Sequence, residues 1–168
     1  MRIHVVGNSG SGKTTLARRI ARERGIPHVE LDGLFHQPGW TSLPDDEFRA
    51  AVTEAISGAD WVVDGNYMGA LDDLVHGQAD VVLWLDYPRS VTFPRVLRRT
   101  LHRVATRKEL WNGNRERWSN LFRRDPEKSI LRWSWTQHEA YQAKLGARVD
   151  ERWVQLRHPR ETEAWLRR

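Results

Sequence analysis

Short apolar runs alternate along the chain with stretches in which apolar residues recur every three or four positions. The runs span residues 2–6, 28–31, 61–64, 80–87 and 152–156. Two of them, WVVD (61–64) and DVVLWLDY (80–87), are continuously apolar, which is typical of strands buried on both faces of a parallel sheet. The pattern therefore predicts five strands.

Helical periodicity fills the intervals between these strands. In residues 13–24, Leu16 and Ile20 are four apart and Gly25 provides a stop. The remaining predicted helices span 45–57, 94–108, 125–146 and 159–168, whereas residues 38–44 (PGWTSLP) are expected to form a loop. Strands that alternate with helices require crossover connections. The sequence therefore predicts a single three-layer α/β domain over 1–168, with a parallel five-stranded sheet, helices on both faces, and ligands at the carboxyl ends of the strands.

Charge is distributed unevenly over the 168 residues. Residues 1–88 hold 7 Lys and Arg against 13 Asp and Glu, whereas residues 89–168 hold 20 against 9, and the total is +5. Such a division favours an anionic ligand between the halves or an anionic partner outside. The absence of cysteine excludes disulfides and thiolate metal sites. No apolar run approaches the ~20 residues of a membrane span, and the start of the chain does not resemble a signal peptide. We therefore expect a cytoplasmic protein with no membrane partner.

The stretch GNSGSGKT (7–14) matches the phosphate-binding pattern G-x-x-x-x-G-K-[ST]. It follows a predicted strand and opens a predicted helix, so its backbone N–H groups and the helix N-terminus can converge on an anion. Lys13 is expected to reach the β- and γ-phosphates, and the Thr14 hydroxyl to bind Mg²⁺. The expected nucleotide-binding residues are Gly7, Asn8, Ser9, Gly10, Ser11, Gly12, Lys13, Thr14 and Thr15.

Two aspartates follow predicted strands, Asp32 in ELDG and Asp64 in VVDGNY. Small kinases place carboxylates at such strand ends. Either residue could hold Mg²⁺ through water or accept the proton of an attacking hydroxyl, and Asp64 is the expected metal partner beside Thr14. For each residue the alternative is an ordinary helix cap or turn, because Asp-Gly pairs also occur in plain turns.

Nearly the whole chain resembles the adenylate-kinase-related P-loop proteins that are labelled DNA topology modulation proteins. The motifs that carry the resemblance are GNSGSGKTTLARRIA, ELDGLFHQPGW, WVVDGNY, DVVLWLDYPR and ELWNGNRERW. The resemblance implies a fold like that of adenylate and shikimate kinases. It also implies ATP and Mg²⁺ as cofactors, an acceptor-binding insertion over about 33–58, a short lid over about 108–124, and an adenine site near 157–161. Adenylate kinases continue the Asp-Gly motif with an arginine that grips the nucleoside monophosphate, and Met68 stands at that position here.

By the same resemblance, two arginines of the helix that precedes the lid follow Pro88 by seven and eleven residues. These are Arg95 and Arg99, which would touch the ATP phosphates or the purine. Arg103 extends the same ridge, and Arg115 and Arg117 could close over the transferring phosphate. At about 100° per residue, Arg95, Arg99 and Arg103 share the basic half of the helix with Arg98 and Arg107, which a phosphate clamp does not need.

Two functions remain open on the sequence alone. The first is an ATP-dependent phosphotransferase, on a nucleoside, a nucleotide or a small metabolite, whose acceptor pocket His36 and some of the nine tryptophans would line. Its catalytic residues would be Lys13, Asp32, Asp64, Arg99, Arg103 and Arg115. The second is a nucleotide-dependent, DNA-binding or topology-modulating ATPase that uses the basic helix 94–108, although no nucleic-acid recognition motif accompanies that helix.

Overall fold

A five-stranded parallel sheet forms the centre of the computed structural model, which describes residues 1–67, 69–116 and 130–167. The strands lie in the order β2 (His28–Glu30), β5 (Trp61–Asp64), β1 (Arg2–Gly7), β6 (Val81–Leu85) and β7 (Trp153–Leu156). The predicted α/β class and the five predicted strands are confirmed. Because the chain enters the sheet centrally at β1, the loop after β1 lies in the middle of the carboxyl edge.

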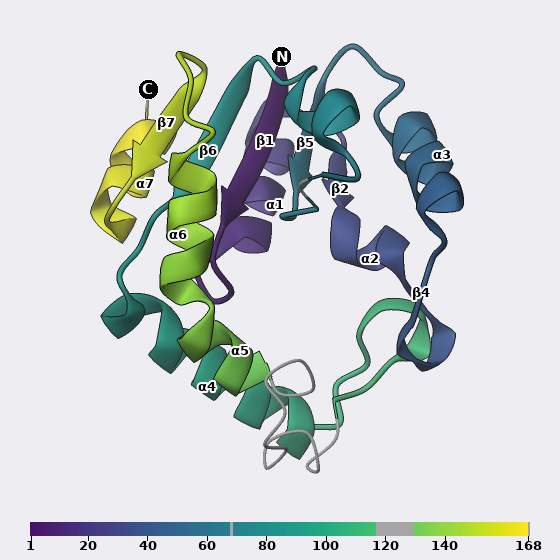
Figure 1. Ribbon diagram of the computed structural model, residues 1–168, viewed down its shortest axis with the longest axis vertical. Helices are drawn as coiled ribbons and strands as arrows, with labels where there is room; N and C mark the ends of the chain where they lie inside the picture. Colours follow the sequence, from purple (N-terminus) through teal and green to yellow (C-terminus); the bar gives the residue numbers. More distant parts are fainter. Residues whose placement is uncertain (68, 117–129, 168) are drawn as a thin grey trace.

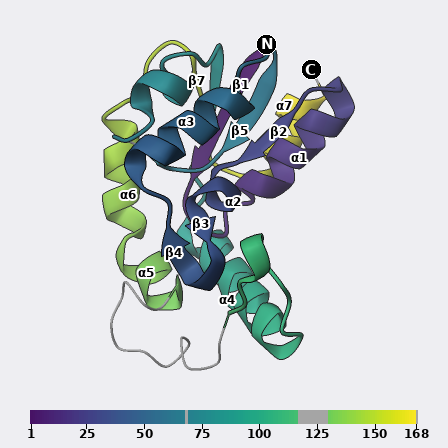
Figure 2. The same ribbon diagram turned by 90° about the vertical axis from the view of Figure 1, so that its right-hand side faces the viewer.

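Helices cover both faces of the sheet (Figure 2). Helices α1 (Lys13–Arg24) and α7 (Pro159–Leu166) lie on one side, and α3 (Asp45–Ala55) and α6 (His138–Gly146) lie on the other. Alternate residues of β1 supply the two cores, since Ile3 and Val5 pack with α1 whereas Val6 packs with α3. Within the described residues, no helix combines the length and the apolar character needed to cross a bilayer.

Helix α4 (Arg89–Ala105) runs below the carboxyl edge of the sheet, beside α5 (Ile130–Thr136) (Figure 1). Its buried positions recur every four residues, at Thr92, Val96, Thr100 and Val104. Leu97 and Leu101 lie off this row and are 36% and 42% exposed. The buried side of α4 is turned toward the loop after β1, and Arg99 and Arg103 beside it are partly buried.

The segment after β2 differs from the expectation. Asp32 does not close a strand but lies in the short helix α2 (Leu31–Phe35). The loop expected over 38–44 holds a 3-10 turn, η1 (Pro38–Trp40), and a short strand, β4 (Thr41–Ser42), which pairs with β3 (His36–Gln37) just before it. This turn is tight because Gly39 and Trp40 both adopt positive φ angles, of 72° and 62°.

Two further short elements and one interrupted helix complete the described chain. A π-helical turn, η2 (Asp72–His76), precedes β6, and a 3-10 turn, η3 (Trp111–Gly113), follows α4. The single helix expected over 125–146 is wrong in its described part, where α5 and α6 are separate helices divided at Gln137. Residues 125–129 of that prediction lie outside the described residues.

Candidate functional site

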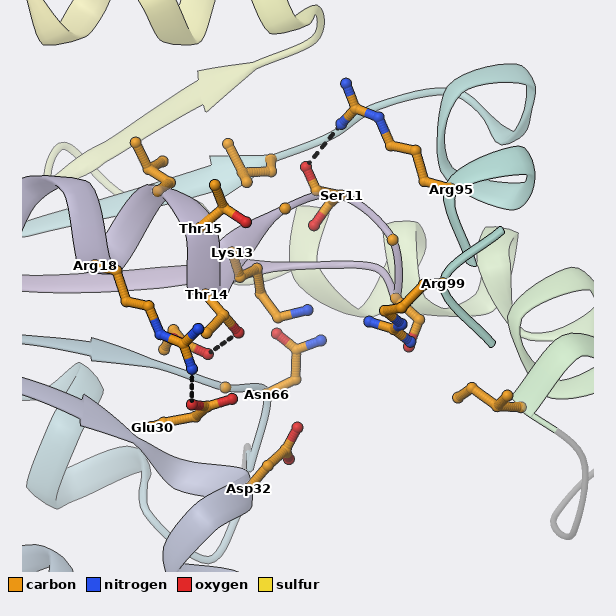
Figure 3. Close-up of a pocket in the computed structure, with 18 of the residues that line it drawn as sticks. Ser11, Lys13, Thr14, Thr15, Arg18, Glu30, Asp32, Asn66, Arg95 and Arg99 are labelled. Carbon is orange, nitrogen blue, oxygen red and sulfur yellow. Dashed lines mark hydrogen bonds and ion pairs between the residues drawn. The ribbon is translucent and has the colours of Figure 1, made fainter. Parts of the chain in front are cut away.

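A cleft of about 1150 Å³ opens at the carboxyl edge of the sheet. Its walls come from the loop after β1, the ends of β2 and β5, the inner side of α4, and the segment 31–42. Figure 3 shows side chains from these separate elements pointing into one space, with Lys13, Asn66 and Asp32 on the sheet side and Arg99 on the α4 side. The cleft therefore lies where ligands of open α/β sheets bind.

The phosphate-binding loop, residues 7–14, curls against α4. Gly10 has a φ of 79°, and a β-carbon there would collide with the backbone of Thr92 and the side chain of Val96. Gly12 has a φ of 98° and directly precedes the first residue of α1. Glycine meets both requirements, a left-handed backbone and close approach to a neighbouring helix. The N-terminus of α1 consequently faces the cleft with its N–H groups available to an anion.

Lys13 folds back over this loop. Its Nζ donates to the carbonyl oxygens of Gly7 (2.7 Å) and Asn8 (3.2 Å). Burial lowers the pKa of Lys13, and the charges of Asp32 and Asp64 oppose that shift. A desolvated ammonium group beside the phosphate-binding loop is well placed to bind a polyanion.

Thr14 and Asp64 form a pair of oxygen donors below the loop. Thr14 Oγ1 donates to Asp64 Oδ1 at 3.0 Å, and His28 Nε2 lies 2.7 Å from the other carboxylate oxygen. Mg²⁺ in nucleotide sites takes one or two protein oxygens and completes its shell with phosphate and water. A hydroxyl beside a 3% exposed carboxylate fits that requirement. Sequence reasoning missed His28, whose contact with Asp64 spans 36 positions.

Asn66 ties the phosphate-binding loop to the end of β5. Its amide accepts from the backbone N–H of Gly7 (3.1 Å) and donates to the carbonyl of the same residue (2.6 Å). A two-point amide contact of this kind holds the first residue of the loop in one orientation. The motif DGNY contained this signal, because Asn66 follows directly on the β5 strand end.

Asp32 lies on the sheet side of the cleft, beside Tyr67 (Figure 3). Tyr67 donates a hydrogen bond to Asp32 Oδ1 at 2.8 Å. Burial and the neighbouring Asp32 charge raise the pKa of Tyr67 well above its ordinary value, so the phenol keeps its proton. The Asp32 charge also acts on Lys13, Arg99 and Tyr141. Asp32 can therefore receive a proton from a bound hydroxyl group while Tyr67 holds its other oxygen.

Three of the expected arginines line the cleft from α4. Arg95 Nη1 donates to the Ser11 carbonyl at 3.3 Å, and its guanidinium lies 5.7 Å from the centre of the Tyr87 ring. Burial lowers the pKa of Arg99, and Arg103 adds to that shift. Among the described residues, Arg99 Nε has no hydrogen-bond partner. Arg99 is thus a partly desolvated cation that faces Lys13 across the cleft (Figure 3).

The structure separates the other arginines of the basic stretch. Arg103 pairs with Glu116 at 2.9 Å, with side chains 19% and 14% exposed. Arg115 does not line the cleft but pairs with Glu109 on the outside, and its side chain is 51% exposed. Arg98 and Arg107 are exposed. Glu116, the next residue in the sequence, lines the cleft instead of Arg115. Sequence reasoning missed Glu116.

Aromatic side chains occupy the end of the cleft remote from α7. One group comes from segment 31–42 and the loops beside it: Phe35, His36, Trp40, Tyr67 and Trp111. A second group, Trp133 and Tyr141, comes from α5 and α6, with ring centres 5.2 Å apart. His36, which the sequence predicted as a lining residue of the acceptor pocket, lies in this group. Burial lowers the pKa of His36, so that its imidazole is neutral near pH 7.

Residues 111–116, which we call the strap, are fastened to segment 31–42. Asn112 Nδ2 donates to the carbonyls of Gly33 (3.3 Å) and His36 (2.6 Å). Asn114 donates to the Gln37 carbonyl and accepts from the Trp40 backbone N–H, both at 2.9 Å. The Trp111 ring also covers Gly33, where a β-carbon would lie 3.0 Å away. These bonds join positions more than 70 residues apart along the chain.

The opposite end of the cleft lies between α1, α4 and α7. Pro159, Thr162 and Leu166 of α7 line it, and Tyr87 makes a hydrogen bond with Thr162 beneath them. Pro159 falls in the segment 157–161 that the resemblance associates with adenine. The remaining expected loop residues Ser9, Ser11, Gly12 and Thr15 also line the cleft. Met68, Arg117 and residues 117–124 of the expected lid lie outside the described residues.

Comparisons with known proteins agree on a kinase fold. No family model matches the chain. Cytidylate kinases from two strains of Nitratidesulfovibrio vulgaris, DP4 and Hildenborough, are 46% identical over 39 residues, which is 23% of this chain and 17% of theirs. The crystal structure of a gluconokinase from Sinorhizobium meliloti 1021 aligns over 99% of this chain and 87% of its own, with a TM-score of 0.53 and 21% identity. The chain therefore has the fold of a P-loop kinase.

Proposed function

We propose that the protein is an ATP-dependent phosphotransferase that acts on the hydroxyl group of a small molecule. One observation carries the proposal: a phosphate-binding loop, the Thr14–Asp64 oxygen pair and the Asp32 carboxylate all face one cleft. Phosphoryl transfer requires charge neutralisation, positioning and a group to receive the hydroxyl proton. In this proposal, the loop neutralises charge, the Thr14–Asp64 pair positions the phosphates through Mg²⁺, and Asp32 receives the hydroxyl proton.

The roles follow from the contacts. Lys13 and the N–H groups at the start of α1 would bind the β- and γ-phosphates, and Thr14 and Asp64 would hold Mg²⁺. When bound, the ion supplies positive charge to the transferring phosphoryl group. Arg99 would neutralise the same group from the opposite wall, and Asp32 would orient the acceptor hydroxyl and take its proton. Arg95 and the residues of α7 would hold the nucleoside part of ATP.

The remaining assignments are proposals of the same kind. The names of the matching proteins, cytidylate kinase and gluconokinase, are consistent with a nucleotide and a small acceptor. We propose a single domain over 1–168, with an acceptor-binding insertion at about 33–58 and a lid at about 108–124, in the cytoplasm. Arg103 would act mainly by holding Glu116, and the outward position of Arg115 favours no role for it in transfer.

A nucleic-acid function has less support in this arrangement. Arg95, Arg99 and Arg103 line the cleft, and of these Arg99 and Arg103 are partly buried. The exposed cations of the basic helix 94–108 that do not line the cleft are Arg98, Arg107 and Lys108. Duplex binding needs several cations along one exposed surface. A phosphate clamp needs cations inside a cleft, and the arginines of α4 meet that need.

The decisive experiment measures ATP consumption with Mg²⁺ in the presence of nucleosides, nucleoside monophosphates and small metabolites. At least one acceptor should raise ADP release well above the rate with water alone. Lys13→Ala should abolish that rise and weaken ATP binding, because the main cationic contact to the β- and γ-phosphates is lost. Unchanged turnover in Lys13→Ala would contradict the proposed function.

A further inference from the structure

We infer that the acceptor is an uncharged alcohol that carries a planar ring, such as a nucleoside. Asp32 and Glu116 disfavour an acceptor that already carries a phosphate. The inference rests on the proposed function and narrows the class of its acceptor. Three features of the cleft support it: facing aromatic groups, a carboxylate oxygen that has no partner among the described residues, and the balance of charge around both.

The aromatic groups lie on opposite sides of the acceptor end. On the side of α2, the ring centres of Phe35 and Tyr67 lie 4.8 Å apart. On the side of α5 and α6, the rings of Trp133 and Tyr141 form the second group. Figure 1 shows α2 and α6 on either side of the carboxyl edge. Asp32, Tyr67 and Tyr141 all line this cleft, so both groups border the space in which Asp32 lies. Stacking on such rings contributes about 1–3 kcal/mol for a nucleobase.

Glu116 supplies a hydrogen-bond acceptor to the same space. Its Oε1 accepts from Arg103, whereas Oε2 is buried and has no partner among the described residues. His36 Nδ1 is buried and unpartnered in the same sense. A buried polar atom without a partner is costly, and a ligand that bonds to it recovers that cost. The N–H and O–H groups of a base or sugar are suitable donors to Glu116.

Among the described residues, the charge balance differs between the two ends of the cleft. Lys13 and Arg99 face each other at the phosphate end. At the acceptor end, Glu116 neutralises Arg103, and Asp32 adds a further negative charge. A phosphate carried by the acceptor would therefore lie beside two carboxylates whose charges repel it. Repulsion of this kind is an effective way to reject a closely related ligand.

The first test compares acceptors that differ in one feature. Nucleosides, their 5′-monophosphates and D-ribose are offered with ATP and Mg²⁺, and ADP release and product mass are recorded. We expect kcat/KM for the best nucleoside to exceed that for its monophosphate and for ribose by at least about tenfold. A preference for monophosphates, or equal use of ribose, overturns the inference and leaves the phosphotransferase proposal standing. If no acceptor raises ATP consumption above the Lys13→Ala level, both fail.

The second test uses two tryptophans of one helix. Trp133 lines the cleft, whereas Trp135 is 51% exposed and packs on Phe93 and Arg89. Trp133→Ala should raise the nucleoside KM about tenfold with an unchanged Kd for ATP. Trp135→Ala should leave both values near wild type. Equal effects of the two substitutions would show that the α5 aromatic does not contact the acceptor.

The third test changes charge without changing shape. Glu116→Gln keeps the side-chain length and a hydrogen-bonding oxygen but removes the carboxylate charge. The preference for nucleoside over monophosphate should fall about tenfold, chiefly through KM for the monophosphate. Glu109→Gln, on the outer side of the same hairpin-like segment, is the matched control. An unaltered preference in Glu116→Gln contradicts the assigned role of this carboxylate.

Discussion

Asp32 is connected by charge or hydrogen bond to both halves of the cleft, which makes it the residue with the sharpest expected effect. Asp32→Asn preserves shape but removes the group that takes the acceptor proton. We expect kcat to fall by roughly 10²–10⁴, with the Kd for ATP near wild type. Single-turnover measurements of product formation and a separate ATP-binding titration check this result. The control is Asp73→Asn, whose carboxylate pairs with Arg49 on the surface; a similar loss in both variants would remove the assigned role.

At this scale, the residues that could be predicted from the sequence are those with a fixed spacing in a motif. Lys13 and Thr14 followed from the glycine-rich pattern, and Asp32 and Asp64 from their positions after strands. Their supporting contacts could not be predicted in the same way. Tyr67 reaches Asp32 across 35 positions and Asn66 reaches Gly7 across 59, so both contacts exist only once β2, β5 and β1 have paired.

Helix α4 is the element that distinguishes a phosphate clamp from a nucleic-acid surface. Arg99→Ala removes a buried cation from the cleft and should lower kcat by about 10²–10³, whereas the exposed Arg98→Ala should be nearly silent. A nucleic-acid surface predicts a different result, with similar losses of duplex affinity in both variants and log K falling with log salt by about 0.9 per phosphate contacted. Activity assays and salt-dependent duplex titrations on both variants separate the two functions.

The helical period of α4 was visible in the sequence, but the orientation of the helix was not. A projection along the axis places leucines and valines together and arginines together. In the structure, Leu97 and Leu101 are exposed while Arg99 is mostly buried, because the buried row of α4 runs through Val96 and Thr100 rather than through the leucines. Which side faces inward depends on the phosphate-binding loop, whose Gly10 contacts Thr92 and Val96.

The strap gives a second prediction at the scale of elements. Asn114 is 4% exposed and makes both of its bonds to backbone groups of segment 31–42. Asn114→Ala leaves those groups without a partner, at a cost of about 1–3 kcal/mol. Hydrogen exchange at the Trp40 amide should accelerate by at least about tenfold, and the acceptor KM should rise. Glu109→Gln in the same loop should leave the exchange rate of the Trp40 amide unchanged. Exchange that is as slow in Asn114→Ala as in Glu109→Gln would show that other contacts hold the strap.

For the whole molecule, the alternation of strands and helices was enough to predict the fold class. The order of strands was not predictable from that alternation, since β5 lies between β2 and β1. Nor was the β3–β4 pair, because its turn is fixed from outside by Asn112 and Asn114 of the strap. Local sequence thus predicted elements with their own hydrophobic period, and failed where a distant segment supplies the hydrogen bonds.

The stability of the whole fold should depend on pH through His4 in the central strand. Burial lowers the pKa of His4 to about 4, against 6.5 in an unfolded chain, and its Nε2 lies 3.0 Å from the Gly65 carbonyl. Between these values the unfolded chain binds a proton that the folded protein does not, so stability is lost as the pH falls from 6.5 toward 4. The expected loss in the free energy of unfolding is about 3 kcal/mol.

Urea unfolding at pH 7 and pH 4.5 measures this loss, with His4→Gln as the variant that should show less of it. His102→Gln, at an exposed position on α4, is the matched control and should follow the wild type. An equal pH dependence in His4→Gln would assign the acid sensitivity to other groups.

The strap also has a topological consequence. Starting at the sheet, the path runs through α4 to the strap, crosses by hydrogen bonds to segment 31–42, and returns through α2 and β2 to the sheet, so that it closes on itself. Every part of this circuit contributes residues to the cleft wall, and its backbone path can be followed in Figure 1. A closed path of this kind limits by shape which molecules can reach the cleft. We expect a small molecule to enter through the opening, whereas a long polymer would have to be threaded by one end, so the two asparagine side chains of the strap should favour small substrates over polymers.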